Sequence, residues 1–205
     1  MLLHDVLEVA DLEHARRAPD LASWVGDRNV ERQLAEHARE RGIAPLYLAH
    51  AAEIVHRTLT APLALIDGTQ LPPLIAATAF AREVEFSYPL PAGLDPLHSR
   101  RGLVKGFIDA LVAYDDELWV LDYKSDFLGE VDRARAADLR VREHYAVQAR
   151  LYAIAADRLR GRRKLAGLLF AFIRHGIVVP VRIGDDTLAG WTQWLANLPL
   201  QETRI

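Results

Sequence analysis

The sequence predicts an α/β (α+β) fold in which helices flank a mixed central sheet. Two observations support this prediction. Helical patterns of apolar residues occupy the first 60 residues, and strand patterns dominate from residue 79 onward, interrupted by helical segments. The expected order is helices, three strands, a helix, two strands and a helix. A sheet covered by helices is the arrangement that buries the apolar faces of such elements.

Residues 1–78 are predicted to be a helical N-terminal part. Apolar residues recur at helical spacing in three segments, 2–17, 28–41 and 45–60. The proline-rich residues 61–78 are expected to form an irregular connector. Because the first helical pattern starts without a preceding cap residue, we expect the chain to be a domain of a larger protein. A native start at Met1 is the alternative.

Residues 79–205 are predicted to be the sheet-containing core of a single domain that spans residues 1–205. The expected strands lie at 79–90, on both sides of an acidic turn at 114–117, and at 165–174 and 177–183. The expected helices lie at 138–161 and 185–198, and the expected loops at 91–101 and 126–137.

The composition is that of a globular protein, with 51% hydrophobic and 26% charged residues. The net charge of −3 does not indicate a nucleic-acid binder, so contacts with phosphate groups must come from local clusters. No apolar run is long enough for a transmembrane helix, and no signal peptide is recognisable. The absence of cysteine excludes disulfides and thiolate metal sites. We therefore expect a cytoplasmic protein without membrane contacts, with histidine and carboxylates as its possible metal ligands.

The segments GFID, which ends in Asp109, and DYKS, which begins with Asp122, lie on the two arms of a predicted β-hairpin. A two- or four-residue turn places Asp109 opposite Asp122 and Phe107 opposite Lys124. Asp122 and Lys124 share a face, because side chains repeat with period two along a strand. A turn of three or five residues would shift the pairing by one and put the carboxylates on opposite faces.

Two carboxylates and one ammonium group thus converge in apolar surroundings. Opposed carboxylates repel each other, and a buried charge is costly unless it is paired or bound to metal. A divalent cation between Asp109 and Asp122 removes that cost and is the hypothesis we favour. The alternative is a simple ion pair between Lys124 and one of the two aspartates.

Further polar residues lie before and after the hairpin. Glu83 and Glu85 share one face of the strand at 79–90, and we expect that face to be solvated. Tyr145, Gln148 and Tyr152 form a stripe on the helix at 138–161. A glutamine between two tyrosines on an apolar face is unusual, because a buried amide needs hydrogen-bond partners.

The segment GFIDALVAYDDELWVLDYKSDFLGE resembles the C-terminal nuclease domain of RecB-type proteins, which belong to the PD-(D/E)xK nuclease superfamily. Leu3-His4-Asp5 resembles the leading helix of that family, and Arg82–Phe86 its first core strand. Tyr145-x-x-Gln148-x-x-x-Tyr152 resembles its helical Gln/Tyr motif, and the strand Leu168–Arg174 follows as expected. The resemblance is densest over 103–174. The glycine-rich lead-in to the histidine and the helicase motifs are absent.

The resemblance implies a restriction-endonuclease-like core and a metal-dependent exonuclease or endonuclease that hydrolyses DNA. It implies that DNA is the partner, together with a helicase domain and partner subunits in a parent protein that repairs double-strand breaks. The alternatives are a free-standing nuclease of the same superfamily and an inactive module for DNA binding or assembly.

The resemblance also implies roles for individual residues. The expected catalytic residues are Asp109, Asp122 and Lys124. The expected metal ligands are His4, Asp109, Asp122 and the backbone carbonyl of Tyr123, with Mg²⁺ as the ion, Mn²⁺ as a substitute and Ca²⁺ binding without supporting catalysis. Contacts with DNA or support of the site are expected from Gln148, Tyr152 and Tyr145, and basic contacts from Arg133, Arg135, Arg140 and Arg142.

Overall fold

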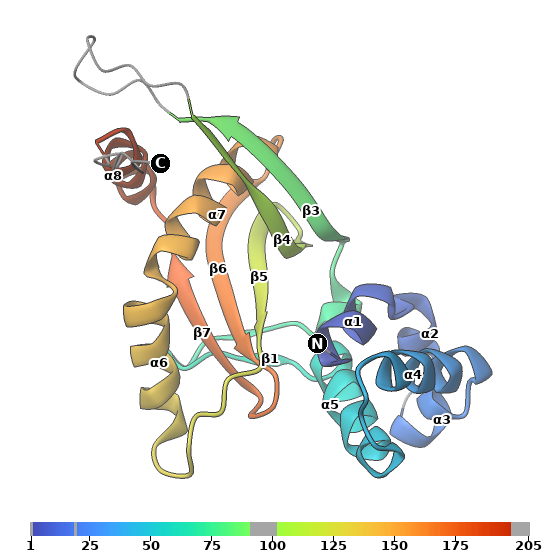
Figure 1. Ribbon diagram of the computed structural model, residues 1–205. Helices are drawn as coiled ribbons and strands as arrows, with labels where there is room; N and C mark the ends of the chain where they lie inside the picture. Colours follow the sequence, from blue (N-terminus) through green and yellow to red (C-terminus); the bar gives the residue numbers. More distant parts are fainter. Residues whose placement is uncertain (1, 19, 91–101, 198–205) are drawn as a thin grey trace, which may run out of the picture.

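The computed structural model describes residues 2–18, 20–90 and 102–197, which form a sheet with helices on both faces (Figure 1). The expected loop at 91–101 lies outside the described residues. The five strands of the main sheet run in the order β3-β4-β5-β6-β7. Their bounds are β3 (Ala79–Pro89), β4 (Leu103–Tyr114), β5 (Glu117–Lys124), β6 (Lys164–Phe172) and β7 (Ile177–Arg182).

The sheet is mixed, as predicted. Strands β5 and β6 are parallel, and every other neighbouring pair is antiparallel. A parallel pair needs a crossover connection. Helices α6 (Arg133–His144) and α7 (Ala146–Leu159) supply it, and α8 (Asp185–Ala196) follows the last strand. The three helices lie on one side of the sheet, away from the N-terminal helices (Figure 1).

The N-terminal helices are α1 (Leu2–Val9), α2 (Leu12–Arg17), α3 (Leu21–Val25), α4 (Arg28–Glu40) and α5 (Leu48–Thr60). The prediction of one helix at 2–17 is wrong. Asp11 interrupts it, because its carboxylate accepts hydrogen bonds from the backbone N–H groups of Glu13 and His14 and so starts a new helix. The Asp20 carboxylate caps α3 in the same way, and that short helix was not predicted.

Two further predictions need correction. Residues 61–78 contain the short strands β1 (Leu63–Ala64) and β2 (Gln70–Leu71), which pair with each other. The helix predicted at 138–161 starts earlier, at Arg133, because the Asp132 side chain caps it. It is interrupted at Tyr145, whose backbone leaves the helical region and separates α6 from α7.

Each face of the sheet carries its own hydrophobic core. On β5, Trp119, Leu121 and Tyr123 pack with the N-terminal helices, whereas Leu118 and Val120 pack with α6 and α7. By this alternation Asp122 and Lys124 belong to the side of α6 and α7.

Strands β3 and β4 change faces near Glu83 and Asp109. On β4, Val112 and Ala110 belong to the core under the N-terminal helices, but Ile108 belongs to the core under α7. Glu83 has a backbone φ of 45°, a conformation that residues other than glycine rarely adopt. The two strands therefore twist at this point, and Asp109 lies where the side chains of β4 change from one face to the other.

None of the described helices has the length and apolar character needed to cross a membrane.

Candidate active site

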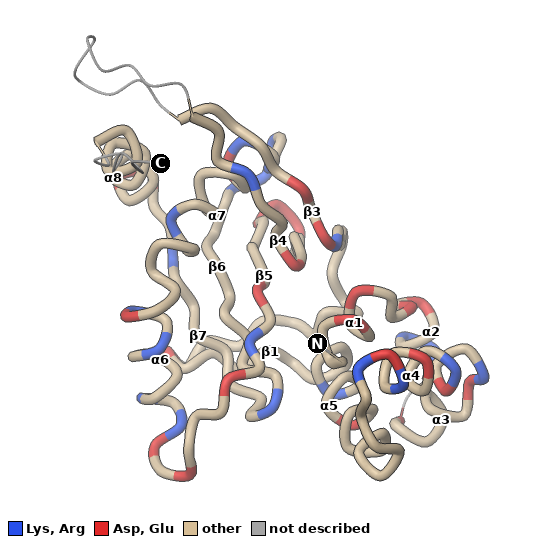
Figure 2. The backbone as a smooth tube through the Cα atoms, in the orientation of Figure 1, with Lys and Arg blue, Asp and Glu red and all other residues tan. Residues whose placement is uncertain are grey.

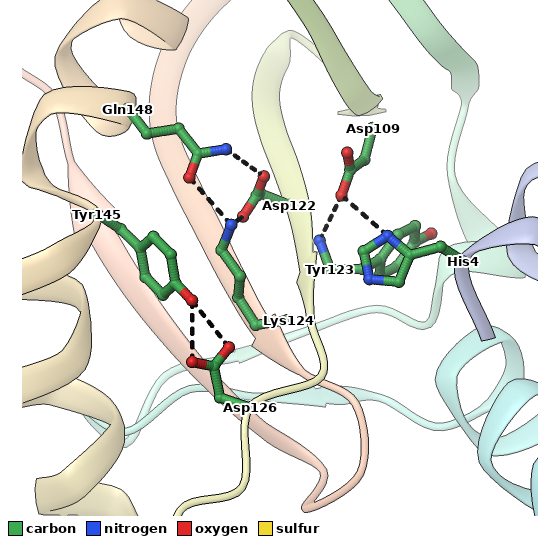
Figure 3. Close-up of polar contacts among 8 residues, drawn as sticks. All are labelled: His4, Asp109, Asp122, Tyr123, Lys124, Asp126, Tyr145 and Gln148. Carbon is green, nitrogen blue, oxygen red and sulfur yellow. Dashed lines mark hydrogen bonds and ion pairs between the residues drawn. The ribbon is translucent and has the colours of Figure 1, made fainter. Parts of the chain in front are cut away.

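The predicted site residues gather at the end of β5, between α1 on one side and the start of α7 on the other (Figure 3). The predicted hairpin register is confirmed from Tyr114↔Glu117 to Ala110↔Leu121. The ladder between β4 and β5 ends there, so Asp109 is not paired with Asp122, and Phe107 is not paired with Lys124. The prediction that the two carboxylates lie opposite each other on one face is therefore wrong. The predicted pairing of Phe107 with Lys124 is also wrong, because β4 leaves β5 where it twists.

Asp109 lies at the point where the two strands part. Its Oδ2 atom accepts a hydrogen bond of 2.8 Å from the backbone N–H of Tyr123. The same oxygen is 3.9 Å from Nδ1 of His4 on α1. The carboxylate therefore faces the N-terminal helices, and one bond ties it to the strand that carries Asp122.

Asp122 is the one charged side chain that is buried among the residues that the structure describes, with 1% of its surface exposed. Its Oδ1 atom accepts a hydrogen bond of 2.8 Å from Nε2 of Gln148, and its Oδ2 atom is 2.5 Å from the Lys124 ammonium nitrogen. Burial raises the pKa of Asp122 to about 7, and the negative charge of Asp109 acts in the same direction. The attraction of Lys124 and the bond from Gln148 limit that rise.

Lys124 is held from several sides. Its ammonium donates to Oε1 of Gln148 at 2.9 Å in addition to the ion pair with Asp122. It also lies 4.0 Å from the centre of the Tyr145 ring. The ion pair between Lys124 and an aspartate, which the sequence left open as the alternative to a metal, is therefore present.

His4 reaches the site from the opposite side. Its ring lies edge-on to the Tyr123 ring, with centroids 6.0 Å apart. Burial lowers the pKa of His4, and the nearby Asp109 carboxylate only partly offsets this effect. A lowered pKa favours the neutral imidazole, which is the form that can bind a metal ion.

The donor set fits a hard divalent cation, although its members are held apart in pairs. Among the described residues, no three His, Asp or Glu side chains converge closely enough to form a ready metal cluster. One imidazole and two carboxylates are nonetheless ligands that suit Mg²⁺ or Mn²⁺. Oδ2 of Asp122 is buried and makes no hydrogen bond beyond its ion pair with Lys124. A cation there would add to the compensation that Lys124 already provides for this buried negative charge.

Glu83 is a carboxylate at this site that the sequence reasoning assigned to a solvated face. It lies opposite Asp109, between the pairs Arg82↔Ala110 and Val84↔Ile108. Partial burial raises its pKa, and the carboxylates of Glu8 and Asp109 add to the rise. A strained backbone at a non-glycine residue is common at functional sites. The sequence analysis paired only the two strands of the hairpin. Pairing the strand at 79–90 with the strand that carries Asp109 would have placed Glu83 beside that aspartate.

The Gln/Tyr stripe faces the site as its spacing predicts. Gln148 bridges Asp122 and Lys124, and Tyr145 donates to both carboxylate oxygens of Asp126, at 2.8 and 3.0 Å. The Tyr152 ring lies edge-on to Phe86, with centroids 5.7 Å apart. Gln148 and Tyr145 therefore contact the side chains of Asp122, Lys124 and Asp126, whereas Tyr152 contacts Phe86.

The arginines near α6 are largely engaged with their own surroundings. Arg142 pairs with Asp138 at 2.9 Å, Arg140 lies 3.7 Å from Asp126, and Arg133 donates to a backbone carbonyl. Blue and red positions lie close together along α6 in Figure 2. A DNA contact from these residues stays a prediction.

Comparison with known proteins places this geometry in a family. A family model of the PD-(D/E)XK nuclease superfamily matches residues 1–204. The RecBCD enzyme subunit RecB of Escherichia coli is 35% identical over 117 residues, which cover 50% of this chain and 10% of that protein. An ATP-dependent helicase/nuclease subunit of Listeria monocytogenes is 32% identical over 97 residues, which cover 44% of this chain and 8% of that protein.

A third relative extends the match along the chain. An ATP-dependent helicase/nuclease subunit of Exiguobacterium sibiricum is 28% identical over 156 residues, which cover 74% of this chain and 13% of that protein. The chain thus spans only 8–13% of the length of these relatives. The family match, in contrast, covers nearly all of this chain and confirms the resemblance seen in the sequence. The chain belongs to the PD-(D/E)XK nuclease superfamily.

Proposed function

We propose that this chain is a Mg²⁺-dependent deoxyribonuclease that hydrolyses phosphodiester bonds in DNA. The observation that carries the proposal is the buried Asp122 carboxylate, which Gln148 and Lys124 hold at the end of β5. Asp109 and His4 lie on the other side of the same strand end. Burial of this carboxylate raises its pKa to about 7 and destabilises its charged form. Groups with such shifted pKa values are concentrated at functional sites.

The metal ligands in this proposal are His4, Asp109, Asp122 and the backbone carbonyl of Tyr123. When bound, the ion polarises the phosphate and lowers the pKa of a water molecule. Mn²⁺ would substitute for Mg²⁺, because an imidazole among oxygen ligands suits it well. Ca²⁺ would bind without supporting hydrolysis.

The remaining steps depend on the side chains of the chain itself. The Lys124 ammonium would donate a hydrogen bond to the attacking water or to a phosphate oxygen, where negative charge develops in the transition state. Gln148 would keep Lys124 and Asp122 in place, because its amide contacts both. Tyr152 and the arginines around α6 would line the path of the DNA backbone.

We further propose that the chain acts as the nuclease part of a helicase-nuclease in the repair of DNA double-strand breaks. The names of the relatives, which describe a part of the RecBCD enzyme and parts of helicase/nucleases, support this. The helicase domain and partner subunits would then be supplied by the parent protein. Because the relatives are bacterial and bacterial DNA lies in the cytoplasm, we propose a cytoplasmic location.

The test is digestion of linear and circular DNA, in single- and double-stranded form, with Mg²⁺ or with a chelator. We expect cleavage by the unaltered chain in Mg²⁺ and none by Asp122→Ala or Lys124→Ala. Asp116→Ala is the matched control, since this exposed aspartate lies in the turn at the far end of the same hairpin. Retained cleavage in Asp122→Ala or Lys124→Ala would refute the proposal. DNA binding without cleavage by the unaltered chain would favour an inactive binding module.

A further inference from the structure

The ammonium group of Lys124 has three partners for its three N–H donors. Two are the oxygens of Asp122 and Gln148, at 2.5 and 2.9 Å. The third is the face of the Tyr145 ring, whose centre is 4.0 Å away. An ammonium group over an aromatic face is attracted by the ring's electrons, most strongly where water is excluded. Only 12% of the Lys124 side chain is exposed.

The Tyr145 ring is itself fixed at both ends. Its face stacks on the buried Phe170 ring, with centroids 5.7 Å apart and planes inclined by 13°. Its hydroxyl donates to both oxygens of Asp126, just beyond the end of β5. Arg140 lies 3.7 Å from Asp126 on its other side. The pKa of Tyr145 is raised to about 12, first by burial and then by the bond to Asp126, so the phenol stays a donor.

From these contacts we propose that Asp126 and Tyr145 are positioning residues for Lys124: Asp126 anchors the Tyr145 ring, and the ring holds the ammonium in the site. Figure 3 shows this order from Asp126 through Tyr145 to Lys124. A charged acceptor on the phenol also increases the electron density of the ring and so strengthens its attraction for the ammonium.

The ring matters most when Asp122 has another partner. This point rests on the proposed function, in which Asp122 is a metal ligand. Its carboxylate is then shared with the ion and holds Lys124 less strongly. Gln148 and Tyr145 remain as the groups that keep the ammonium from turning toward solvent. The N–H of Lys124 that points to Asp122 in the metal-free structure is then available for water or phosphate, while the amide and the ring keep their own contacts with the ammonium.

The contact is tested first by NMR, without metal or DNA. The chain has three lysines, Lys105, Lys124 and Lys164, so their ε-methylene signals are few and can be assigned by single Lys→Met variants. Protons above an aromatic ring are shifted upfield. We expect that shift for Lys124 alone, its retention in Tyr145→Phe and a large reduction in Tyr145→Leu, where only the more distant Phe170 ring, 5.7 Å from the ammonium nitrogen, would remain. An unshifted Lys124 signal in the unaltered chain would overturn the inference.

The positioning role is then tested by the kinetics of DNA cleavage. We expect Tyr145→Leu to lower kcat about tenfold, equivalent to about 1.4 kcal/mol of barrier, with little change in KM. Asp126→Asn and Tyr145→Phe keep the ring and should lower kcat by a smaller factor, roughly threefold. Asp157→Asn is the matched control, since it alters another aspartate that pairs with an arginine, Arg160, which has no proposed role in the site.

The outcomes separate this inference from the proposed function. A raised KM with unchanged kcat in Tyr145→Leu would mean that the ring contacts DNA, and it would overturn the positioning role. If Tyr145→Leu does not fold, Asp126→Asn and Tyr145→Phe decide, and an unchanged kcat in both refutes the inference. Absence of cleavage by the unaltered chain refutes the proposed function, whereas the NMR shift tests the lysine contact whether or not DNA is cut.

Discussion

The amide of Gln148 connects the two central residues of the site, and replacing it tests how the buried charge is held. Gln148→Leu keeps a similar volume, but it removes the N–H that donates to Asp122 and the oxygen that accepts from Lys124. A hydrogen bond to a charged group contributes roughly 1.5–3 kcal/mol to stability. A buried charged group that loses its partner is destabilised further, because water cannot replace the lost hydrogen bond. We expect Gln148→Leu to lower the free energy of unfolding by about 2–4 kcal/mol.

The assay is urea unfolding in a chelating buffer at pH 8, where Asp122 is mostly ionised because its raised pKa is about 7. A double-mutant cycle with Asp122→Asn isolates the interaction. We expect a coupling energy of at least about 1 kcal/mol at pH 8, and a smaller one at pH 6, where the carboxyl is mostly protonated and its hydrogen bond is weaker.

Gln193→Leu serves as the matched control. Gln193 is an exposed glutamine on α8, and its replacement should change stability by no more than about 0.5 kcal/mol. If the effects of Gln148→Leu and Asp122→Asn simply add at pH 8, the amide does not hold the buried carboxylate, and the reasoning fails.

Two further predictions concern pH and packing. Since the pKa of Asp122 is raised in the folded state, the metal-free protein should lose stability as pH rises from about 4 to about 7, by on the order of 3–4 kcal/mol at most. Thermal unfolding at pH 5 and pH 8 should show a smaller pH effect in Asp122→Asn, and an equal effect would contradict this assignment. Gly167→Ala should destabilise the protein by about 2 kcal/mol or more in urea unfolding, because its Cβ would lie 2.4 Å from the carbonyl oxygen of Val181. Gly190→Ala on α8 is the control, with no atom within 4 Å of the added carbon, and a similar loss of stability there would refute the packing argument.

The hairpin shows how far sequence reasoning reaches. The turn between Tyr114 and Glu117 sets the register, and the structure has that register up to Ala110↔Leu121. The alternation along β5 correctly places Asp122 and Lys124 on one face, because period two is a property of the strand itself. The sequence could not reveal that β4 turns away at Asp109, since that depends on the twist of two strands and on the unusual backbone of Glu83.

The helices show the same division. Apolar periodicity located the longer helices but not the short helix α3, and the breaks at Asp11 and Tyr145 were missed because both residues sit inside continuous helical patterns. Asp11 breaks the pattern by binding backbone N–H groups, which is a local signal that the sequence carries. The break at Tyr145 has no such cap, and it brings the hydroxyl of that residue to Asp126.

The sequence by itself determined the family, through the resemblance of its motifs, and the mixed sheet, through the periods of strand and helix. Only the tertiary structure decided which partner each charge takes. It pairs Lys124 with Asp122, Gln148 and the Tyr145 ring, and it places His4 beside Asp109. Most of these choices depend on distances between elements far apart in the chain, and burial strengthens the contacts of Asp122 and Lys124.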